Sequence, residues 1–127
     1  MALKTKQLVF LDSDVVRLNA ILQNNSENPQ YTAQLAEEIK KARIVDKAHL
    51  PPGVVVMHSV ISILDKETDE VSTYTLVYPW ESDVDNDKIS VLAPIGTALI
   101  GYGEGDEISW NVPKGVRRFK VLSVQHP

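Results

Sequence analysis

The stretch that decides the fold is Lys88-Ile89-Ser90-Val91-Leu92-Ala93-Pro94-Ile95-Gly96-Thr97-Ala98-Leu99-Ile100-Gly101. Its first part, residues 88–92, predicts a short strand. Pro94 fits the first turn of a helix, where a backbone N–H has no intrahelical partner, so we expect a short helix over residues 94–100. Gly101 ends that helix. The stretch therefore predicts a strand that leads directly into a short helix.

Further strands are predicted on both sides of this stretch, because β-branched residues and apolar alternation recur there. These strands cover residues 54–57, 60–64, 71–77, 107–112 and 116–124. The third of them ends before Pro79, which cannot donate to a sheet ladder. The last two form a hairpin around Pro113-Lys114-Gly115. Residues 51–127 therefore predict an α+β body, a strongly bent antiparallel sheet with one short helix.

A helical hairpin is predicted ahead of the sheet, because apolar residues recur at steps of three and four along two segments. They are Leu11, Val15, Leu18 and Leu22 in the first segment and Leu35, Ile39 and Ala42 in the second. The polar residues 24–29 end the first helix, so we expect residues 1–50 to form a short antiparallel hairpin, a coiled coil. Neither helix is long enough to be stable alone, so the hairpin should pack on the second half.

The composition divides the chain at Leu50-Pro51-Pro52-Gly53 into two predicted domains, residues 1–50 and 51–127. The first carries seven basic and six acidic residues, the second six and eleven. The formal net charge of −4 argues against general nucleic-acid binding, which relies on many contacts between basic residues and phosphate. The absence of cysteine excludes disulfides and thiolate zinc sites. No apolar run is long enough to span a membrane, so we expect a soluble, cytoplasmic protein.

No local motif predicts catalysis or metal binding by this chain. Acidic residues alternate over residues 81–87, as at the start of a calcium loop, but Lys88 and Pro94 occupy the positions that need glycine and glutamate. Residues 101–106 are rich in glycine, yet they lack the spacing of a nucleotide-binding loop and contain two acids that would repel phosphate. The three histidines are far apart in the sequence. We therefore expect no enzymatic activity, no metal and no cofactor.

Several motifs together resemble the carboxy-terminal domain of the Gre transcript-cleavage factors. They are Ser90-Val91-Leu92-Ala93-Pro94-Ile95-Gly96, Ala98-Leu99-Ile100-Gly101, Gly105-Asp106, Pro113 and Gly115. Within that superfamily the chain is most similar to the short subgroup called regulator of nucleoside diphosphate kinase, through Met57-His58-Ser59, Leu76-Val77-Tyr78-Pro79 and Trp110-Asn111-Val112-Pro113. The resemblance covers residues 54–124. It implies an amino-terminal antiparallel coiled coil joined to an FKBP-like body.

The resemblance also implies binding to bacterial RNA polymerase at the rim of its secondary channel. Gre factors dock there partly through the segment before the short helix. The resemblance therefore assigns the residues of this segment to the polymerase-binding surface, namely Ser90, Leu92, Ala93, Pro94 and Ile95. The cleavage factors tend to carry Asp-Ser-Pro where this chain has Leu92-Ala93-Pro94, so this chain shares only the proline with their pattern. Leu92 either offers an apolar contact to a rim helix or, like Ile95, belongs to the core.

The predicted hairpin tip differs from that of the cleavage factors, which deliver tip carboxylates that help hold a catalytic metal in the polymerase active site. Here the tip contains Asn24, Asn25 and Glu27, and a single carboxylate is a poor site for a hard cation. Helices of roughly 12 to 15 residues span only about 18 to 23 Å. The hairpin is therefore expected to be far shorter than a Gre coiled coil.

The leading hypothesis is a non-enzymatic transcription regulator that binds RNA polymerase and competes with Gre cleavage factors for the secondary channel. It requires no cofactor, small-molecule substrate, membrane or sequence-specific contact with nucleic acid. The first alternative is a transcript-cleavage-stimulating elongation factor, in which Glu27 and a neighbouring acid reach the active site. The second alternative, a peptidyl-prolyl isomerase, is suggested only by the FKBP-like architecture.

Overall fold

The computed structural model describes residues 7–24, 29–112 and 115–127. The described residues form α-helices and a mixed sheet, which is the predicted α+β class. In chain order these elements are β1 (Val9–Leu11), α1 (Asp12–Asn24), α2 (Pro29–Lys41), β2 (Arg43–Val45), β3 (Val60–Asp65), β4 (Val71–Val77), β5 (Lys88–Ser90), α3 (Pro94–Leu99), β6 (Glu107–Val112) and β7 (Gly115–Gln125). The short helix expected over residues 94–100 is thus confirmed to within one residue.

Five strands form one mixed sheet in the order β5-β4-β3-β7-β6. The pairs β3–β4, β3–β7 and β6–β7 are antiparallel, but β5 runs parallel to β4. The prediction of an antiparallel sheet is therefore wrong at this edge. The reason lies in the connection. Two short 3-10 helices, η2 (Pro79–Glu81) and η3 (Val84–Asn86), carry the chain back alongside β4 so that β5 begins opposite Thr75, whereas a tight hairpin turn would have reversed it.

The Val-rich run at residues 54–57 is buried, but it is not a strand of the sheet. Val54 makes one isolated bridge with Gly103, and the Val55 N–H donates to the carbonyl of Tyr102 at 2.7 Å. All four residues of the run are at most 9% exposed. Burial therefore explains the apolar composition that predicted a strand here.

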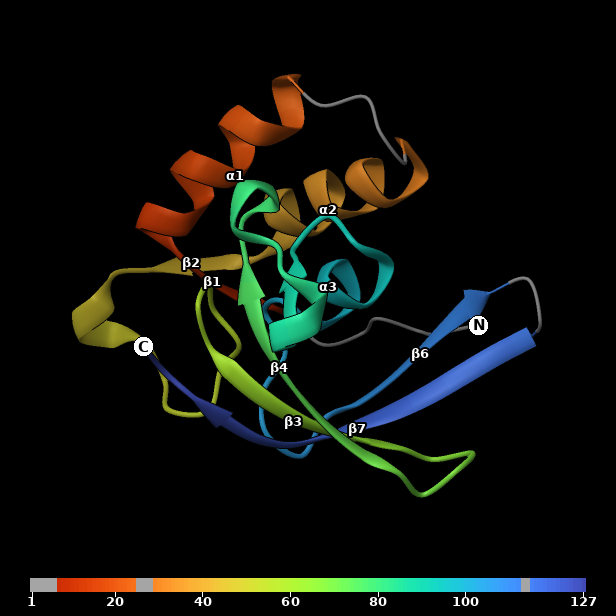
Figure 1. Ribbon diagram of the computed structural model, residues 1–127. Coiled ribbons are helices and arrows are strands. Elements are labelled where there is room, and N and C mark those ends of the chain that lie inside the picture. The colour runs from red at the N-terminus through yellow and green to blue at the C-terminus, as the bar shows by residue number, and fades with distance from the viewer. Residues whose placement is uncertain (1–6, 25–28, 113–114) are drawn as a thin grey trace.

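A second, two-stranded sheet is formed by β1 and β2, which pair in parallel through Val9 with Arg43 and Leu11 with Val45. These strands lie directly before α1 and after α2, so they close the base of the helical hairpin (Figure 1). The sequence placed Leu11 on the first helical stripe, and the structure corrects this to the end of β1. Strands of three residues are too short to show a periodicity of their own.

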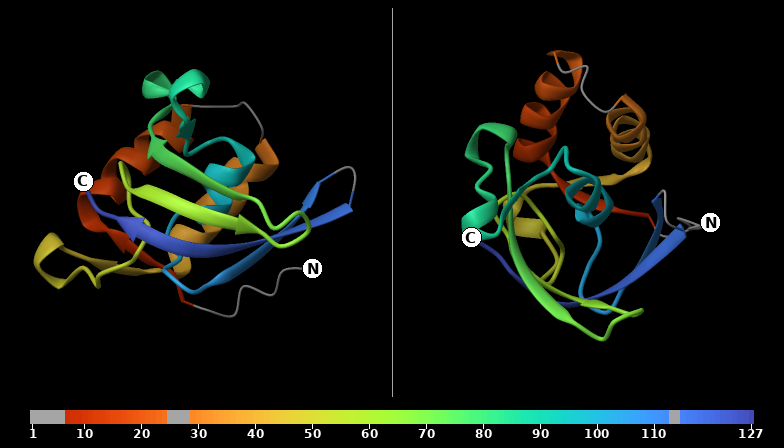
Figure 2. Two further views of the ribbon diagram at one scale, coloured as in Figure 1. Left: turned by 60° about the horizontal axis from the view of Figure 1, so that its bottom comes forward. Right: turned by 45° about the vertical axis from the view of Figure 1, so that its right-hand side comes forward.

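The helical hairpin packs against the sheet and is not a separate body. All three helices lie on the same side of the curved sheet (Figures 1 and 2). Leu18 of α1 and Leu35 of α2 are fully buried in the same hydrophobic core as Ile61, Leu76 and Val121 of the sheet. This confirms that the hairpin depends on the second half of the chain for its burial. The core thus crosses the composition boundary at residue 50.

Candidate functional site

Hydrogen bonds fix segment 90–95 in the turn between β5 and α3. The Val91 N–H donates to the last carbonyl of β4 at 2.8 Å. The Ser90 hydroxyl accepts a hydrogen bond from the Leu92 N–H at 3.0 Å, and the Ser90 carbonyl accepts one from the Ala93 N–H at 3.0 Å. Ala93 is the N-cap of α3 and Pro94 lies in its first turn, where it needs no donor. The segment is therefore presented in a defined shape.

A close approach between α3 and β5 completes this turn. The Thr97 hydroxyl donates to the Val91 carbonyl at 2.7 Å. A Cβ atom on Gly96 would lie 2.1 Å from the Ser90 carbonyl oxygen, so only glycine allows α3 to come this near. The start of α3 is thus packed tightly against the backbone of segment 90–95.

The residues assigned to the polymerase-binding surface differ in exposure. Pro94 is exposed, and Ser90, Ala93 and Ile95 are half-buried. Leu92 is 7% exposed and belongs to the hydrophobic core. Of the two interpretations of Leu92, the core position is the one that fits the structure, which removes it as a direct apolar contact. The assignment of the segment to polymerase binding stays a prediction, and Pro94 is its exposed residue.

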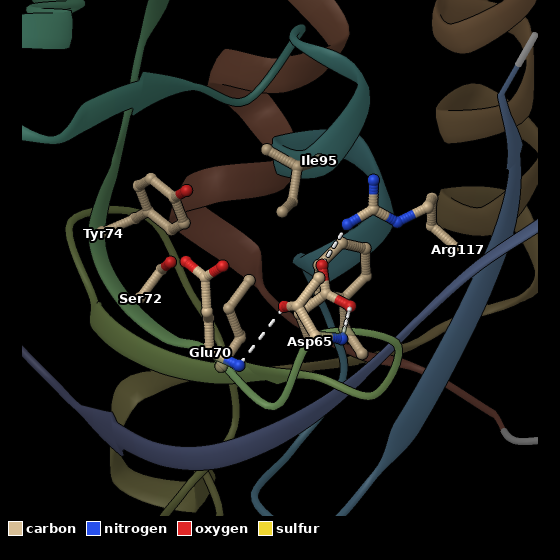
Figure 3. Close-up of a pocket in the computed structure, with 9 residues that line it drawn as sticks. Asp65, Glu70, Ser72, Tyr74, Ile95 and Arg117 are labelled. Atoms are coloured by element: carbon tan, nitrogen blue, oxygen red, sulfur yellow. Dashed lines mark hydrogen bonds and ion pairs between the residues drawn. The ribbon is translucent and has the colours of Figure 1, made fainter. Parts of the chain in front are cut away.

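Ile95 also lines a pocket of about 260 Å³ on the helix-facing side of the sheet (Figure 3). Three strands, the β3–β4 turn and the start of α3 contribute to it. The lining residues are Ile63, Asp65, Thr68, Glu70, Ser72, Tyr74, Ile95, Arg117 and Phe119. The pocket is therefore directly continuous with segment 90–95.

An ion pair between Asp65 of β3 and Arg117 of β7 crosses one side of the pocket (Figure 3). Desolvation opposes ionisation of Asp65. However, the hydrogen bonds from the Glu67 N–H at 2.9 Å and from Arg117 outweigh it and hold the pKa of Asp65 below its usual value. The Arg117 guanidinium carbon also lies 5.8 Å from the centre of the Phe119 ring. Asp65 is therefore a carboxylate at neutral pH and Arg117 has a fixed position.

The chemistry of the pocket suits a polar group above an apolar floor. Ile63, Ile95 and Phe119 supply apolar surface, while Glu70 supplies a carboxylate. The buried Nε atom of Arg117 has no hydrogen-bond partner among the described residues. A partner group that carries an oxygen atom could accept this hydrogen bond. The pocket can therefore bind a side chain of another protein through both polar and apolar contacts.

The helical hairpin is joined to the body by a buried carboxylate. Asp14 of α1 is 9% exposed and accepts a hydrogen bond from the Met57 N–H at 3.1 Å. Burial raises the pKa of Asp14, although this hydrogen bond and the nearby His58 and Arg17 act in the opposite direction. Burial likewise raises the pKa of Tyr78 to about 12, so its hydroxyl stays protonated. The base of the hairpin is therefore anchored by specific polar contacts.

The two helices of the hairpin each contain 13 residues, within the expected range. Their length is about 20 Å at 1.5 Å per residue. Of the predicted tip residues, Asn24 ends α1, whereas Asn25 and Glu27 lie outside the described residues.

Other polar residues singled out by the sequence have internal partners. Asp83 accepts a hydrogen bond from the Asn86 side chain at 2.7 Å, so the acidic turn is partly self-satisfied. The three histidines contact Asp46, Glu81 and the Val54 carbonyl respectively. Within residues 7–24, 29–112 and 115–127, no group of His, Asp and Glu side chains is placed to hold a metal ion. The same ranges contain no helix that is long and apolar enough to cross a membrane.

The sequence did not identify the pocket. Its polar residues come from strands that are distant in the chain, and a single sequence contains no motif that joins them. One signal was available. Asp65 follows the buried Ile61 and Ile63 at steps of two, so it falls on the inward face of its strand, where a charged residue is unusual.

Comparison with known proteins identifies the family. Residues 50–126 match the family described as transcription elongation factor GreA/GreB, C-terminal. This region contains segment 90–95 and the pocket. The chain belongs to the GreA/GreB family. The predicted membership in the Gre superfamily is thereby confirmed.

Curated relatives extend this similarity beyond the C-terminal region. The transcription elongation factor GreA of Syntrophobacter fumaroxidans is 37% identical over 114 residues, which cover 80% of this chain and 73% of the relative. That of Chelativorans sp. is 34% identical over 114 residues, which cover 90% of this chain and 73% of the relative. These names fit the first alternative of the sequence analysis, an elongation factor, better than the leading hypothesis of a competitor.

Solved structures share the fold over most of this chain. A GreA/GreB transcription elongation factor from Nitrosomonas europaea has a TM-score of 0.81 and 35% sequence identity, covering 96% of this chain and all of that protein. Gfh1 of Thermus thermophilus, a GreA factor homologue, has a TM-score of 0.51 and 23% identity, covering 95% of this chain and all of that protein. At this identity, the similarity to Gfh1 concerns the fold alone.

Proposed function

We propose that this GreA/GreB family member is a transcription elongation factor that acts on bacterial RNA polymerase. It binds the rim of the secondary channel through segment 90–95 and the adjoining pocket. The observation that carries the proposal is the position of Pro94. This exposed residue is fixed by the contacts of Ser90 and Gly96, borders the pocket through Ile95, and lies within the region that matches the family.

The proposed surface combines the features of a protein-binding site. Pro94 and the half-buried Ala93 and Ile95 provide apolar contact without flexible side chains, so little conformational entropy is lost on binding. The pocket beside them offers the Arg117 donor and the Glu70 carboxylate, which can select a polar group of the partner.

Transcript-cleavage stimulation is the first candidate activity, since relatives named transcription elongation factor GreA fit an elongation factor better than a competitor. In this activity, α1 and α2 enter the channel. Glu27, which lies between α1 and α2 in the sequence, would then help to hold the metal ion that the polymerase uses to cleave backtracked RNA. The contact between Asp14 and Met57 supports it, because this contact fixes the base of the hairpin on the docked body.

Competition with other Gre factors, without cleavage, is the second candidate function. The observation that favours it is the 13-residue length of both helices, which corresponds to about 20 Å. A hairpin of this length would occupy the entrance of the channel. Docking through segment 90–95 is common to both candidates.

Docking is tested by capture of core RNA polymerase on the immobilised full-length chain, comparing wild type with Pro94→Glu. We expect Pro94→Glu to weaken capture, because it places a charge on the apolar contact. Pro52→Glu is the matched control, since it changes another exposed proline outside the proposed surface. Equal capture by wild type and Pro94→Glu would remove segment 90–95 from the proposal.

The two activities are separated with a stalled, backtracked elongation complex. A cleavage stimulator shortens the RNA, and Glu27→Ala abolishes the shortening. A competitor leaves the RNA intact but suppresses the shortening caused by an added Gre cleavage factor. A chain that binds polymerase and does neither has no role of the kind proposed.

A further inference from the structure

A second exposed surface lies in the connection between β4 and β5. Trp80 is 71% exposed and Val84 is 80% exposed. We call this surface the Trp80 knob and define it by Trp80, Val84, Asp85 and Asp87. The segment η2 lies beside α1, on the outside of the molecule (Figures 1 and 2). An exposed tryptophan of this kind is typical of protein contact sites.

The Trp80 ring is held in place by the residues beneath it. It stacks on the ring of Tyr78, with 5.1 Å between centroids and 7° between planes. Tyr78 is itself 2% exposed and packs edge-on against His58 at 5.6 Å. Glu81 accepts hydrogen bonds from the Tyr78 N–H at 3.1 Å and from His58 Nε2 at 2.8 Å. One face of the indole is thus covered and the ring is preorganised, while its exposure leaves the opposite face for a partner.

The charge around the indole determines the kind of partner. Asp85 and Asp87 are exposed, and neither side chain forms an ion pair with any described residue. Residues 81–88 contain four acidic residues and one basic residue, Lys88, and Arg17 of α1 lies near Tyr78, so the connection still carries a net negative charge. Such a surface repels nucleic-acid phosphates and attracts cations. An arginine or lysine can also stack on the free face of the indole through a cation–π interaction.

The knob is close to the proposed docking segment. η3 is followed directly by β5, and its three residues lead into Ser90. Three strand residues span about 10 Å, so a protein bound at segment 90–95 extends naturally over the knob. The two surfaces also belong to one rigid unit, because β5 is paired with β4 through residues 75–77.

We propose that the Trp80 knob binds a basic polypeptide segment of the same polymerase partner, with an arginine or lysine side chain over Trp80 and further basic side chains paired with Asp85 and Asp87. This inference rests on the proposed function, since it names the chemistry of a second contact in that complex.

The experiment measures the dissociation constant of the full-length chain for core RNA polymerase at low and high salt. We expect Trp80→Ala to weaken binding about 10-fold, as for an aromatic anchor, and Trp80→Phe to retain most of the affinity. The double variant Asp85→Asn/Asp87→Asn should bind several-fold more weakly at low salt, with a smaller difference at high salt. Asparagine suits position 87, where φ is 57°.

Two matched controls test whether these effects belong to the knob. Val71→Thr changes a residue that is 58% exposed on the opposite side of the sheet, and it preserves the β-branched shape. Asp46→Asn neutralises another exposed carboxylate and leaves an oxygen that can still cap the short 3-10 helix η1 (Lys47–His49). Both controls should bind polymerase like wild type, and the near-UV circular dichroism of every variant reports its folding.

The outcomes separate this inference from the proposed function. If Pro94→Glu weakens binding while Trp80→Ala binds like wild type, the knob is not a contact and only the docking segment stands. If Asp85→Asn/Asp87→Asn binds more tightly than wild type, the knob faces phosphate and a basic partner is excluded. If wild type itself does not bind polymerase, the proposed function fails, and this inference fails with it.

Discussion

The carboxylate of Asp14 on α1 accepts a hydrogen bond from the backbone N–H of Met57, 3.1 Å away. The two residues are 43 positions apart in the chain, and both are buried. The contact joins the helical hairpin to the buried run at residues 54–57. A buried N–H without an acceptor is costly, so this one hydrogen bond constrains how the hairpin sits on the body.

Asp14→Ala should therefore destabilise the protein by about 1 to 3 kcal/mol, because the Met57 N–H loses its acceptor. Asp14→Asn should cost less, since the amide oxygen can still accept that hydrogen bond. Urea unfolding at neutral pH measures both free energies. Equal stability of Asp14→Ala and wild type would show that Met57 finds another acceptor.

The pH dependence of stability provides a separate test of Asp14. Burial raises its pKa in the folded state above the value of 3.8 expected in the unfolded chain, so the folded state holds this proton more tightly. The contribution of Asp14 to stability therefore falls as the pH rises from 3.8 to the raised pKa, and it is constant above that pKa. In Asp14→Asn this fall should be absent from the stability–pH curve.

Asp65 should show the opposite behaviour. Its pKa in the folded state is lowered, so its contribution to stability is present above the unfolded pKa and is lost as the pH falls through the folded pKa. Arg117→Ala should raise the pKa of Asp65 in an NMR titration of the carboxyl carbon. Arg118→Ala is the control, because Arg118 pairs with Glu67 and not with Asp65. An unchanged pKa in Arg117→Ala would mean that the backbone hydrogen bonds alone hold it down.

The burial of Leu92 predicts a loss of stability when its side chain is shortened. Leu92→Ala should cost about 2 to 4 kcal/mol, because it removes core contacts and leaves a cavity. Val16→Ala should change stability by less than about 0.5 kcal/mol, since Val16 is 71% exposed. Thermal unfolding compares the two. A folded Leu92→Ala with unchanged stability would return Leu92 to the set of surface contacts.

The space beside Gly96 predicts that even one methyl group is not tolerated there. Gly96→Ala places a Cβ 2.1 Å from the Ser90 carbonyl oxygen, a backbone atom, so α3 must move away from β5 at a cost of about 3 kcal/mol. Gly105→Ala meets no atom within 4 Å and should cost only about 1 kcal/mol for its positive φ. Urea unfolding distinguishes them, and similar losses would contradict the tight contact at Gly96.

Local signals were sufficient for the elements with strong periodicity or clear end residues. The stripes around Leu18 and Leu35 predicted two helices that are present, and Pro94 predicted the start of α3. Each of these signals acts within a few residues of the chain, so a single sequence contains it. The motifs around segment 90–95 likewise predicted the family that the comparisons confirm.

Interactions between distant residues were beyond such signals. The pairing of β1 with β2 joins residues 34 positions apart, and the parallel course of β5 depends on how η2 and η3 turn the chain. Residues 54–57 have the composition of a strand because they are buried, and burial is set by what packs on them. The pocket is assembled from Asp65, Tyr74 and Arg117 only once β3, β4 and β7 are aligned.

The sequence by itself therefore determined the fold class, the helical hairpin, the position of α3 and membership in the Gre superfamily, because these follow from local preferences and motifs. Only the tertiary structure decided that Leu92 faces the core while Pro94 is exposed, that Arg117 reaches Asp65 across a pocket, and that Trp80 rests on Tyr78 at the surface. The physical reason is that exposure and contact are properties of the packed chain. A residue has neither until elements far apart in the sequence have come together.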